Sequence, residues 1–216
     1  MAMSRPPREN LRQEILDAAE ARLWRYGLKK TTIDEIAADA GIGKGTVYLY
    51  FDSKETIACA LVAKYKESAL HEQELLARDR SLKPHERIRR IIKHNVMNAH
   101  ARCADSPEAA EVILTLRPRF ARMMRPYLAQ EVALIAEVIE EGIQIGIFCC
   151  QDSLLAARAM KFASIGFMPP YPCVETIQEI ETELDNVIDM GLRSLKPSTP
   201  CKESQIGTDH QTNKVT

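Results

Sequence analysis

The chain has 216 residues, of which 45% are hydrophobic and 27% charged, and its formal net charge is -1. These values are ordinary for a soluble globular protein, and they exclude a protein that coats DNA through bulk positive charge. The polar N-terminus lacks the apolar run of a secretory signal, and no later stretch reaches the roughly 18 apolar residues that a membrane-spanning helix needs. We therefore expect a cytoplasmic protein that has no membrane partner.

Apolar residues recur at helical spacing along most of the chain, and no segment shows the alternation of a strand. The first helix is predicted over residues 8–27, and Gly27 lies where a left-handed cap is favoured. A short second helix begins at a T-x-x-E capping box formed by Thr32 and Glu35. Two helices are thus expected before residue 41.

A tight glycine-containing turn at residues 41–43 separates the second helix from a third. The third helix is predicted from about Lys44 to Tyr50, and a long fourth helix follows a cap at Asp52 or Ser53. A short helix, a tight turn and a second helix that enters the major groove make up a helix-turn-helix. This segment is therefore predicted to bind DNA.

Helical spacing resumes after a polar break near residues 80–84. The basic run at residues 85–93 is interpreted as a solvated helix face. Pro118 and Pro126 interrupt a later helix, so we expect a break or kink there.

The predicted fold is all-α, with about nine helices. Residues 1–53 are expected to form a helix-turn-helix domain of three helices, and residues 54–196 a larger helical bundle. Residues 197–216 form a polar tail that is expected to be disordered.

Polar, small and aromatic side chains gather on the outer face of the third helix, where no core needs them. Lys44 and Thr46 can donate to phosphate oxygens or base edges, and Gly45 allows the DNA to approach the backbone closely. The hydroxyls of Tyr48 and Tyr50 can donate to phosphate. The alternative, a helical hairpin with no DNA role, leaves this face unexplained. The predicted DNA contacts are Thr32, Gly43, Lys44, Gly45, Thr46, Tyr48, Leu49, Tyr50 and Lys54.

Residues 31–57 resemble the signature of the TetR family of transcriptional regulators, and strong similarity extends over about residues 8–65. Two positions depart from the signature. Gly43 stands where the family usually has Ser, so the third helix lacks a side-chain cap. Leu49 stands where many members have an aromatic or polar residue, which bears on the operator sequence. The matched positions are Thr32, Ile36, Ala37, Ala40, Gly41, Gly45, Thr46, Tyr48, Tyr50, Phe51, Ser53, Lys54 and Glu55.

The resemblance implies a homodimeric repressor that binds a palindromic double-stranded DNA operator and is released by a small-molecule effector. It also implies that residues 54–196 form a ligand-binding and dimerisation domain with a pocket among its middle helices. Ordinary core packing, in which Met fills gaps, is the alternative at each candidate position. The candidate lining residues are Tyr65, Met97, Cys103, Phe120, Met123, Met124, Tyr127 and Phe162.

The last two predicted helices offer one surface of small residues and one of apolar residues, which suit a two-fold interface between subunits. The same residues could instead form core within one chain. The candidate dimer contacts are Ala156, Ala159, Ala163, Gly166, Ile180, Leu184, Val187, Ile188 and Gly191.

The six cysteines include no C-x-x-C pair and no Cys/His spacing typical of zinc. We therefore expect no metal site and no cofactor. Cys149 and Cys150 are adjacent, which leaves a redox-responsive DNA-binding regulator as the alternative to a ligand-responsive one. No phosphate-binding glycine loop, nucleophile elbow or H-E-x-x-H motif is present, so we do not expect an enzyme.

Overall fold

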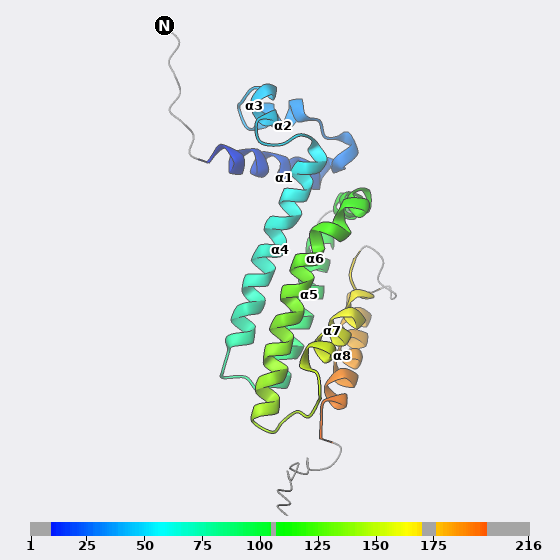
Figure 1. The fold of residues 1–216 in the computed structure, drawn as a ribbon. Coiled ribbons are helices and arrows are strands. Elements are labelled where there is room, and N and C mark those ends of the chain that lie inside the picture. The colour runs from blue at the N-terminus through cyan, green and yellow to red at the C-terminus, as the bar shows by residue number, and fades with distance from the viewer. Residues whose placement is uncertain (1–9, 105–106, 170–175, 198–216) are drawn as a thin grey trace, which may run out of the picture.

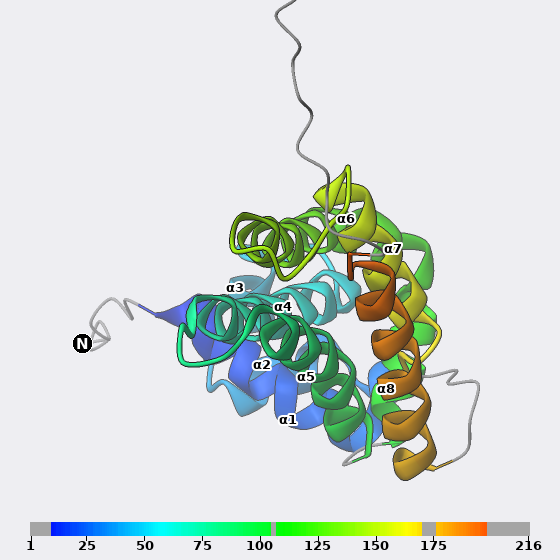
Figure 2. The same ribbon diagram turned by 90° about the horizontal axis from the view of Figure 1, so that it is seen from below.

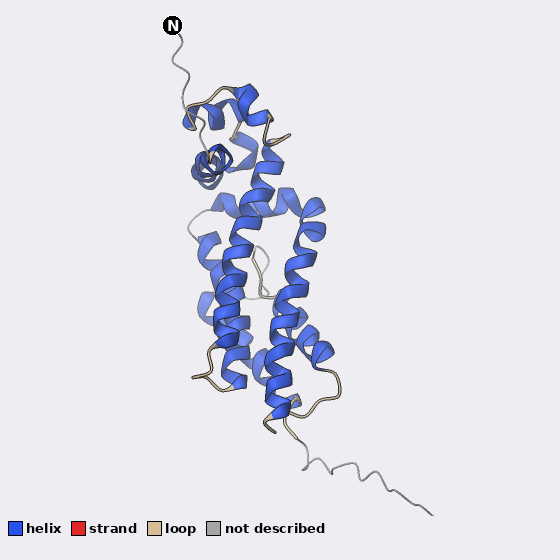
Figure 3. Cartoon of the chain, turned by 60° about the vertical axis from the view of Figure 1, so that its left-hand side comes forward, coloured by secondary structure: helices blue, strands red, loops and turns tan. Residues whose placement is uncertain are grey.

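A computed structural model of the chain describes residues 10–104, 107–169 and 176–197. These residues form helices joined by short loops, with no strand among them, and they confirm the all-α class (Figure 3). The helices are α1 (Leu11–Lys30), α2 (Ile33–Asp39), α3 (Lys44–Tyr48), α4 (Lys54–Arg78), α5 (Pro84–Ala104), α6 (Pro107–Gln144), α7 (Ser153–Ile165) and α8 (Ile177–Ser194). The tail beyond Pro197, which was predicted to be disordered, lies outside the described residues.

The helix breaks predicted at glycine and proline have different outcomes. Gly27 interrupts α1 with a φ of +78°, so α1 is two helices joined at a kink, in agreement with about nine predicted helices. By contrast, the backbone stays helical through Pro118 and Pro126. The start of α6 lies across the end of the bundle, and the remainder then runs along it, so the predicted interruption is a bend (Figure 3).

The helices α1 to α3 form a unit at one end of an elongated molecule, and α4 runs from this unit along the remaining helices (Figure 1). Farther down, α4 packs on α5 and α6, whereas α8 packs on α5 and α7 (Figure 2). No helix in the described part of the chain is both long and apolar enough to cross a membrane.

Two hydrophobic cores occupy the two ends of the molecule. The first is built on α1 to α3 but also contains Ile57 and Leu61 of α4 and Val112 and Leu116 of α6. The second joins α5, α7 and α8 to the rest of α6 and also contains Ala77 of α4. The predicted domain boundary after residue 53 stays a prediction, since side chains on both sides of it share the first core.

The basic run at residues 85–93 is not a solvated face, and that prediction is wrong. Arg87 is buried; its guanidinium donates to the backbone oxygen of Ala77 at 2.7 Å and pairs with Glu141 at 2.7 Å. This contact ties the end of α4 to the end of α6, because one buried cation bonds to both.

The rest of that basic run holds α8 against α5. Arg89 pairs with Asp185 at 2.7 Å and with Asp189, and Lys93 pairs with Asp185 at 2.9 Å. The acidic partners all come from α8, a helix whose position the sequence did not predict. Helical periodicity alone could not identify these pairs, because they join residues 92 to 100 positions apart.

A close approach at Gly142 explains why α6 carries a glycine near its end. Phe148 is buried and folds back onto α6, so that a Cβ at Gly142 would lie 2.6 Å from Phe148 Cε2. No side chain of even one carbon fits there without moving the aromatic ring.

We therefore expect Gly142→Ala to lower the free energy of unfolding by about 1–3 kcal/mol, as overpacking of a core does. Gly45→Ala is the matched control, because a Cβ at Gly45 meets nothing within 4 Å. The control should leave stability unchanged or raise it by up to about 1 kcal/mol. Chemical denaturation monitored by circular dichroism gives both values, and equal stabilities for the two variants would contradict the packing argument.

Candidate nucleic-acid interface and candidate ligand pocket

The predicted capping box at the start of α2 is present. Thr32 Oγ1 accepts from the backbone N–H of Glu35 at 3.3 Å, and Glu35 Oε2 accepts from the backbone N–H of Thr32 at 2.9 Å. The hydroxyl of Thr32 also donates to the Glu35 carboxylate at 2.8 Å, and these hydrogen bonds lower the pKa of Glu35. Thr32 is therefore already engaged in the cap.

Three large side chains in succession are exposed where α3 ends and the following turn begins, two residues earlier than the predicted helix end at Tyr50. Tyr48, Leu49 and Tyr50 are 47%, 81% and 44% exposed, while Val47 and Phe51 on either side of them are buried in the first core. Gly43 caps the helix without a side-chain hydrogen bond, and both Gly43 and Gly45 are exposed. The short helix is thus anchored by one side and presents aromatic rings outward, which suits contact with a partner surface.

The two lysines predicted to contact DNA already have partners. Lys44 Nζ lies 2.7 Å from Asp34 Oδ2, and this hydrogen bond raises the pKa of Lys44. Lys54 Nζ donates to the backbone oxygens of Thr31 at 2.9 Å and Lys29 at 3.3 Å. Lys44 can exchange an exposed carboxylate for a phosphate, whereas Lys54 holds the start of α4 against the end of α1.

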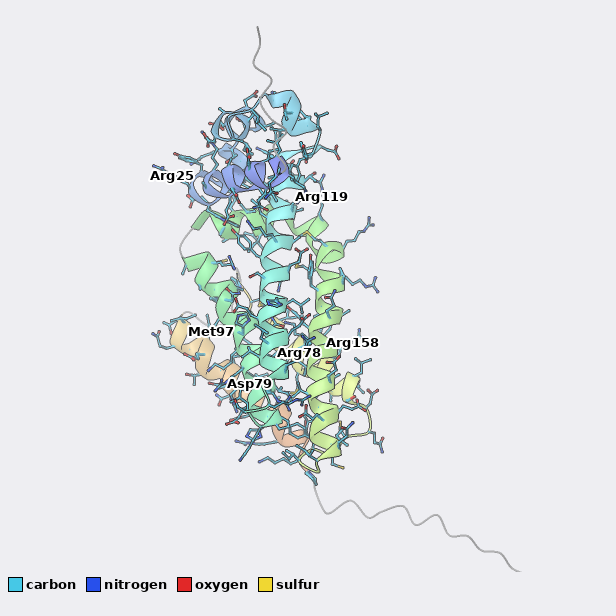
Figure 4. All side chains as sticks on the ribbon, turned by 90° about the vertical axis from the view of Figure 1, so that its left-hand side faces the viewer. Arg25, Arg78, Asp79, Met97, Arg119 and Arg158 are labelled. Atoms are coloured by element: carbon cyan, nitrogen blue, oxygen red, sulfur yellow. The ribbon has the colours of Figure 1, made fainter. Side chains whose placement is uncertain are left out.

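A cavity of about 480 Å³ lies among α1, α4, α5, α6 and α7. Four of the predicted residues line it, namely Tyr65, Cys103, Met124 and Tyr127. Met97 (Figure 4), Met123 and Phe162 are not part of the lining, and for them contact with a ligand stays a prediction. The side chain of Phe120 lies outside the described residues.

The side chain of Phe162 points away from the cavity because of its angular position around the α7 axis. Phe162 is 47% exposed, and the centre of its ring lies 5.5 Å from the guanidinium carbon of Arg158. The preceding residue, Lys161, faces the cavity instead, since successive residues on a helix point about 100° apart.

Sequence reasoning missed a buried polar cluster in the cavity wall. Lys161 Nζ lies 2.7 Å from Glu131 Oε2, and Lys66 Nζ lies 3.4 Å from Glu131 Oε1 and 3.0 Å from Asn95 Oδ1. Burial acts to raise the pKa of Glu131, but the two ammonium groups hold it below its ordinary value. Burial also lowers the pKa of Lys161. One sequence signal could have indicated this cluster: Lys161 lies four positions after Ala157, on the same apolar face of the predicted helix.

A hydrogen-bonded pair joins the cavity wall to α1. Trp24 Nε1 donates to Tyr65 OH at 2.9 Å, and Tyr65 OH donates to Glu20. The guanidinium carbon of Arg102 lies 4.0 Å from the centre of the Tyr65 ring. Burial, followed by the hydrogen bond to Glu20, raises the pKa of Tyr65 to about 12, so the phenol stays neutral and keeps its proton as a donor.

A second cavity, of about 520 Å³, opens at the far end of α4, between α6 and the start of α7. Arg78, beside Asp79 in Figure 4, is one of the charged residues that line it. The others include Arg80 and Glu141, which pair with one another. None of the predicted ligand residues lies here.

The predicted dimer residues fall into two groups. Ile180, Leu184 and Ile188 are buried in the second core, so their assignment to a subunit interface is wrong and the intramolecular alternative holds. Gly191 packs on Met160 within the chain, and Ala156 and Val187 are partly buried.

The other predicted dimer residues are exposed: Ala159 and Ala163 on α7, and Gly166 at its C-cap. Exposed Leu155 lies on the same side of this helix, one turn before Ala159. The outer face of α7 is therefore the part of the prediction that remains available to a partner.

The cysteine environments do not favour redox chemistry. Burial raises the pKa of the Cys59, Cys103 and Cys150 thiols, which lowers the thiolate fraction that reacts with oxidants. Cys149 is partly buried beside Cys150, and Cys173 and Cys201 lie outside the described residues.

Comparison with known proteins bears on both halves of the chain. Residues 15–61 match the family described as "Bacterial regulatory proteins, tetR family", and residues 84–192 match the family described as "Tetracyclin repressor-like, C-terminal domain". The second match alone covers half of the chain.

Two of the individual relatives share only about a quarter of their aligned residues with this chain. The fatty acid metabolism regulator protein of Bacillus subtilis is 26% identical over 155 residues, which are 70% of this chain and 78% of that protein. The transcriptional repressor KstR2 of Mycobacterium tuberculosis is 26% identical over 140 residues, which are 63% of this chain and 68% of that protein. Matches to several other regulators cover 26% to 40% of those proteins.

Among solved structures, a transcriptional regulator from Cytophaga hutchinsonii superposes with a TM-score of 0.69 at 22% identity. The superposition covers 86% of this chain and 98% of that one. At this identity the similarity establishes the fold.

The pair between Lys44 and Asp34 leads to a test of the α3 surface. We expect Asp34→Asn to tighten binding to the DNA upstream of the protein's own gene by about two- to fivefold at low salt. The variant removes a carboxylate that competes with phosphate for Lys44, and the gain should shrink as salt rises.

Fluorescence anisotropy at several salt concentrations measures the effect. Glu137→Gln, which removes an exposed negative charge from α6, is the control and should change affinity less. Unchanged or weaker binding of a stable Asp34→Asn protein would mean that Lys44 does not contact phosphate.

Proposed function

We propose that this chain, which belongs to the TetR family of bacterial regulatory proteins, is a homodimeric repressor that binds a palindromic operator and is released by a small-molecule effector. The family establishes a DNA-binding transcriptional regulator. The repressor role, the two-fold operator and the effector are the parts that we add.

The exposed face of α3 is the observation that carries the DNA-binding assignment. A short helix anchored by Val47, together with the turn that follows it, exposes Tyr48, Leu49 and Tyr50 to solvent, and the helix also carries the cation of Lys44. Phenol hydroxyls and an ammonium donate to phosphate and base edges, and an exposed leucine can contact a thymine methyl group. In a dimer, two such helices would read successive major grooves about 34–36 Å apart.

The contacts between the cavity and α1 support release by a ligand. Trp24 of α1 and Tyr65 of α4 both line the cavity and are hydrogen-bonded to one another. A ligand that alters this contact would shift α1, and with it the spacing of the two α3 helices. A coupling free energy of about 1–3 kcal/mol is enough to change operator occupancy strongly.

The operator assignment is tested with the double variant Lys44→Ala/Tyr48→Ala. We expect it to lose sequence-selective binding to the upstream DNA, with affinity at least about 100-fold lower, because both a cation and an aromatic donor leave the groove. The dimer should stay intact, since neither side chain lies in a core. Gel shift over a salt series measures binding, and analytical ultracentrifugation measures the dimer.

Lys83→Ala, at the start of α5 and far from α3, serves as the control for loss of one cation. It should bind like the unmodified protein. Retained selective binding by the double variant would show that α3 is not the recognition helix.

The dimer assignment is tested on the outer face of α7. Leu155 is 64% exposed, and we expect Leu155→Glu to give a monomer at micromolar concentration, because a charge would be buried at the interface. Leu75→Glu is the matched control on α4, where the leucine is 55% exposed. Sedimentation velocity should report a dimer for the control, and a dimer for both variants would move the interface elsewhere.

A further inference from the structure

The charged groups in the cavity wall are not balanced. Lys161 and Lys66 share one carboxylate, that of Glu131, at 2.7 Å and 3.4 Å. Lys161 is 4% exposed and Glu131 is 3% exposed, so solvent contributes little. Within the described residues no second acidic side chain lies within 4 Å of either ammonium group.

Arg102, an exposed residue, adds a third cation to the lining and has no carboxylate partner among the described residues; its guanidinium carbon lies 4.0 Å from the centre of the Tyr65 ring. Glu131 is the one carboxylate among the residues that line the cavity. The cavity therefore presents an excess of positive charge to whatever fills it.

This imbalance is costly for a structural ion pair. A lysine ammonium has three donors, and a buried one needs acceptors for them. Lys161 Nζ has a single charged partner in the described structure, and the neighbouring Lys66 repels it. By comparison, Lys93 of α5 pairs with two carboxylates of α8, those of Glu181 and Asp185.

The rest of the wall is apolar and includes Val62, Ala69, Ala99, Ile113, Leu114 and Leu128. A volume of about 480 Å³ is in the range of sites for small organic ligands. The cavity thus combines an apolar wall, which can contact an alkyl chain, with one region of positive charge.

We propose that this cavity binds an amphiphilic carboxylate, such as a medium-chain fatty acid, whose carboxylate bridges Lys161 and Lys66 and whose chain lies on the apolar wall. The inference rests on the proposed function, in which the cavity is the effector site. A neutral ligand would leave the excess charge unpaired, and a cationic ligand would increase it. A coenzyme A thioester carries no free carboxylate on its chain, so it would not satisfy the two lysines in this way.

The test is a ligand series on the full-length protein with four probes of equal chain length: decanoate, 1-decanol, decylamine and decanoyl coenzyme A, each below its micelle concentration. Trp24 is the single tryptophan of the chain and lies in the cavity wall, so its fluorescence reports binding directly. We expect decanoate to bind about 10- to 100-fold more tightly than 1-decanol, and decylamine to bind most weakly.

Two variants with opposite expected effects locate the carboxylate. Lys161→Met should weaken decanoate about 10- to 100-fold and leave 1-decanol unchanged, because Glu131 and Lys66 then balance. Glu131→Gln should tighten decanoate, because it removes the competing carboxylate. Lys93→Met is the matched control, a partly buried lysine outside the cavity. Thermal unfolding shows which variants are folded. If a variant does not fold, the ligand series on the unmodified protein still tests the preference for a carboxylate.

Equal binding of decanoate and 1-decanol, or a Lys161→Met protein with unchanged preference, would overturn the carboxylate assignment. Tight binding of decanoyl coenzyme A alone would overturn it as well, while leaving the cavity as an effector site. A gel shift in the same samples tests the proposed function separately. Decanoate that binds in the cavity but leaves the DNA complex intact would support the ligand class and contradict release by this ligand.

Discussion

The structure depends on the long helix α6, which supplies side chains to both hydrophobic cores. Val112 and Leu116 pack among the helices of the N-terminal unit, and Ile135 and Ile139 pack in the core of the bundle. Between these segments α6 supplies Glu131 to the wall of the apolar cavity that also contains Tyr65 and Lys161. Because close-packed interiors resist local deformation, a change in the cavity that moves α6 must also be felt by the helices that carry the candidate recognition surface.

A second connection between cavity and N-terminal unit is polar. Tyr65 on α4 joins Trp24 and Glu20 of α1 through its hydroxyl, and Arg102 of α5 covers its ring. Hydrogen bonds at the edge of a cavity can be replaced by bonds to a ligand, whereas apolar packing cannot. The two regions are therefore joined both by apolar packing and by hydrogen bonds that a ligand can replace, which is the arrangement that a ligand-responsive regulator needs.

The charged residues divide into two kinds. Those between α5 and α8 are matched, because Arg89 and Lys93 meet Glu181, Asp185 and Asp189 and leave no cation without an acid. They hold the last helix in place. Those in the cavity include more cations than acids, and Lys161 and Glu131 among them are buried, at a cost that packing has to offset. Buried groups that stability does not require are typical of binding sites, which is why the cavity cluster, and not the larger number of ion pairs, indicates a ligand.

The sequence alone determined the N-terminal unit well, because its signals are local. The capping box at Thr32 and the kink at Gly27 depend on residues within a few positions of each other, and α3 follows a glycine turn. The bundle was predicted as helices, but not how they face one another. Whether Phe162 or Lys161 turns toward the cavity, and whether Leu184 packs inside the chain or against a partner, depends on contacts between residues far apart in sequence. Helical periodicity gives each helix an apolar face but not the neighbour that covers it, and tertiary packing decides that.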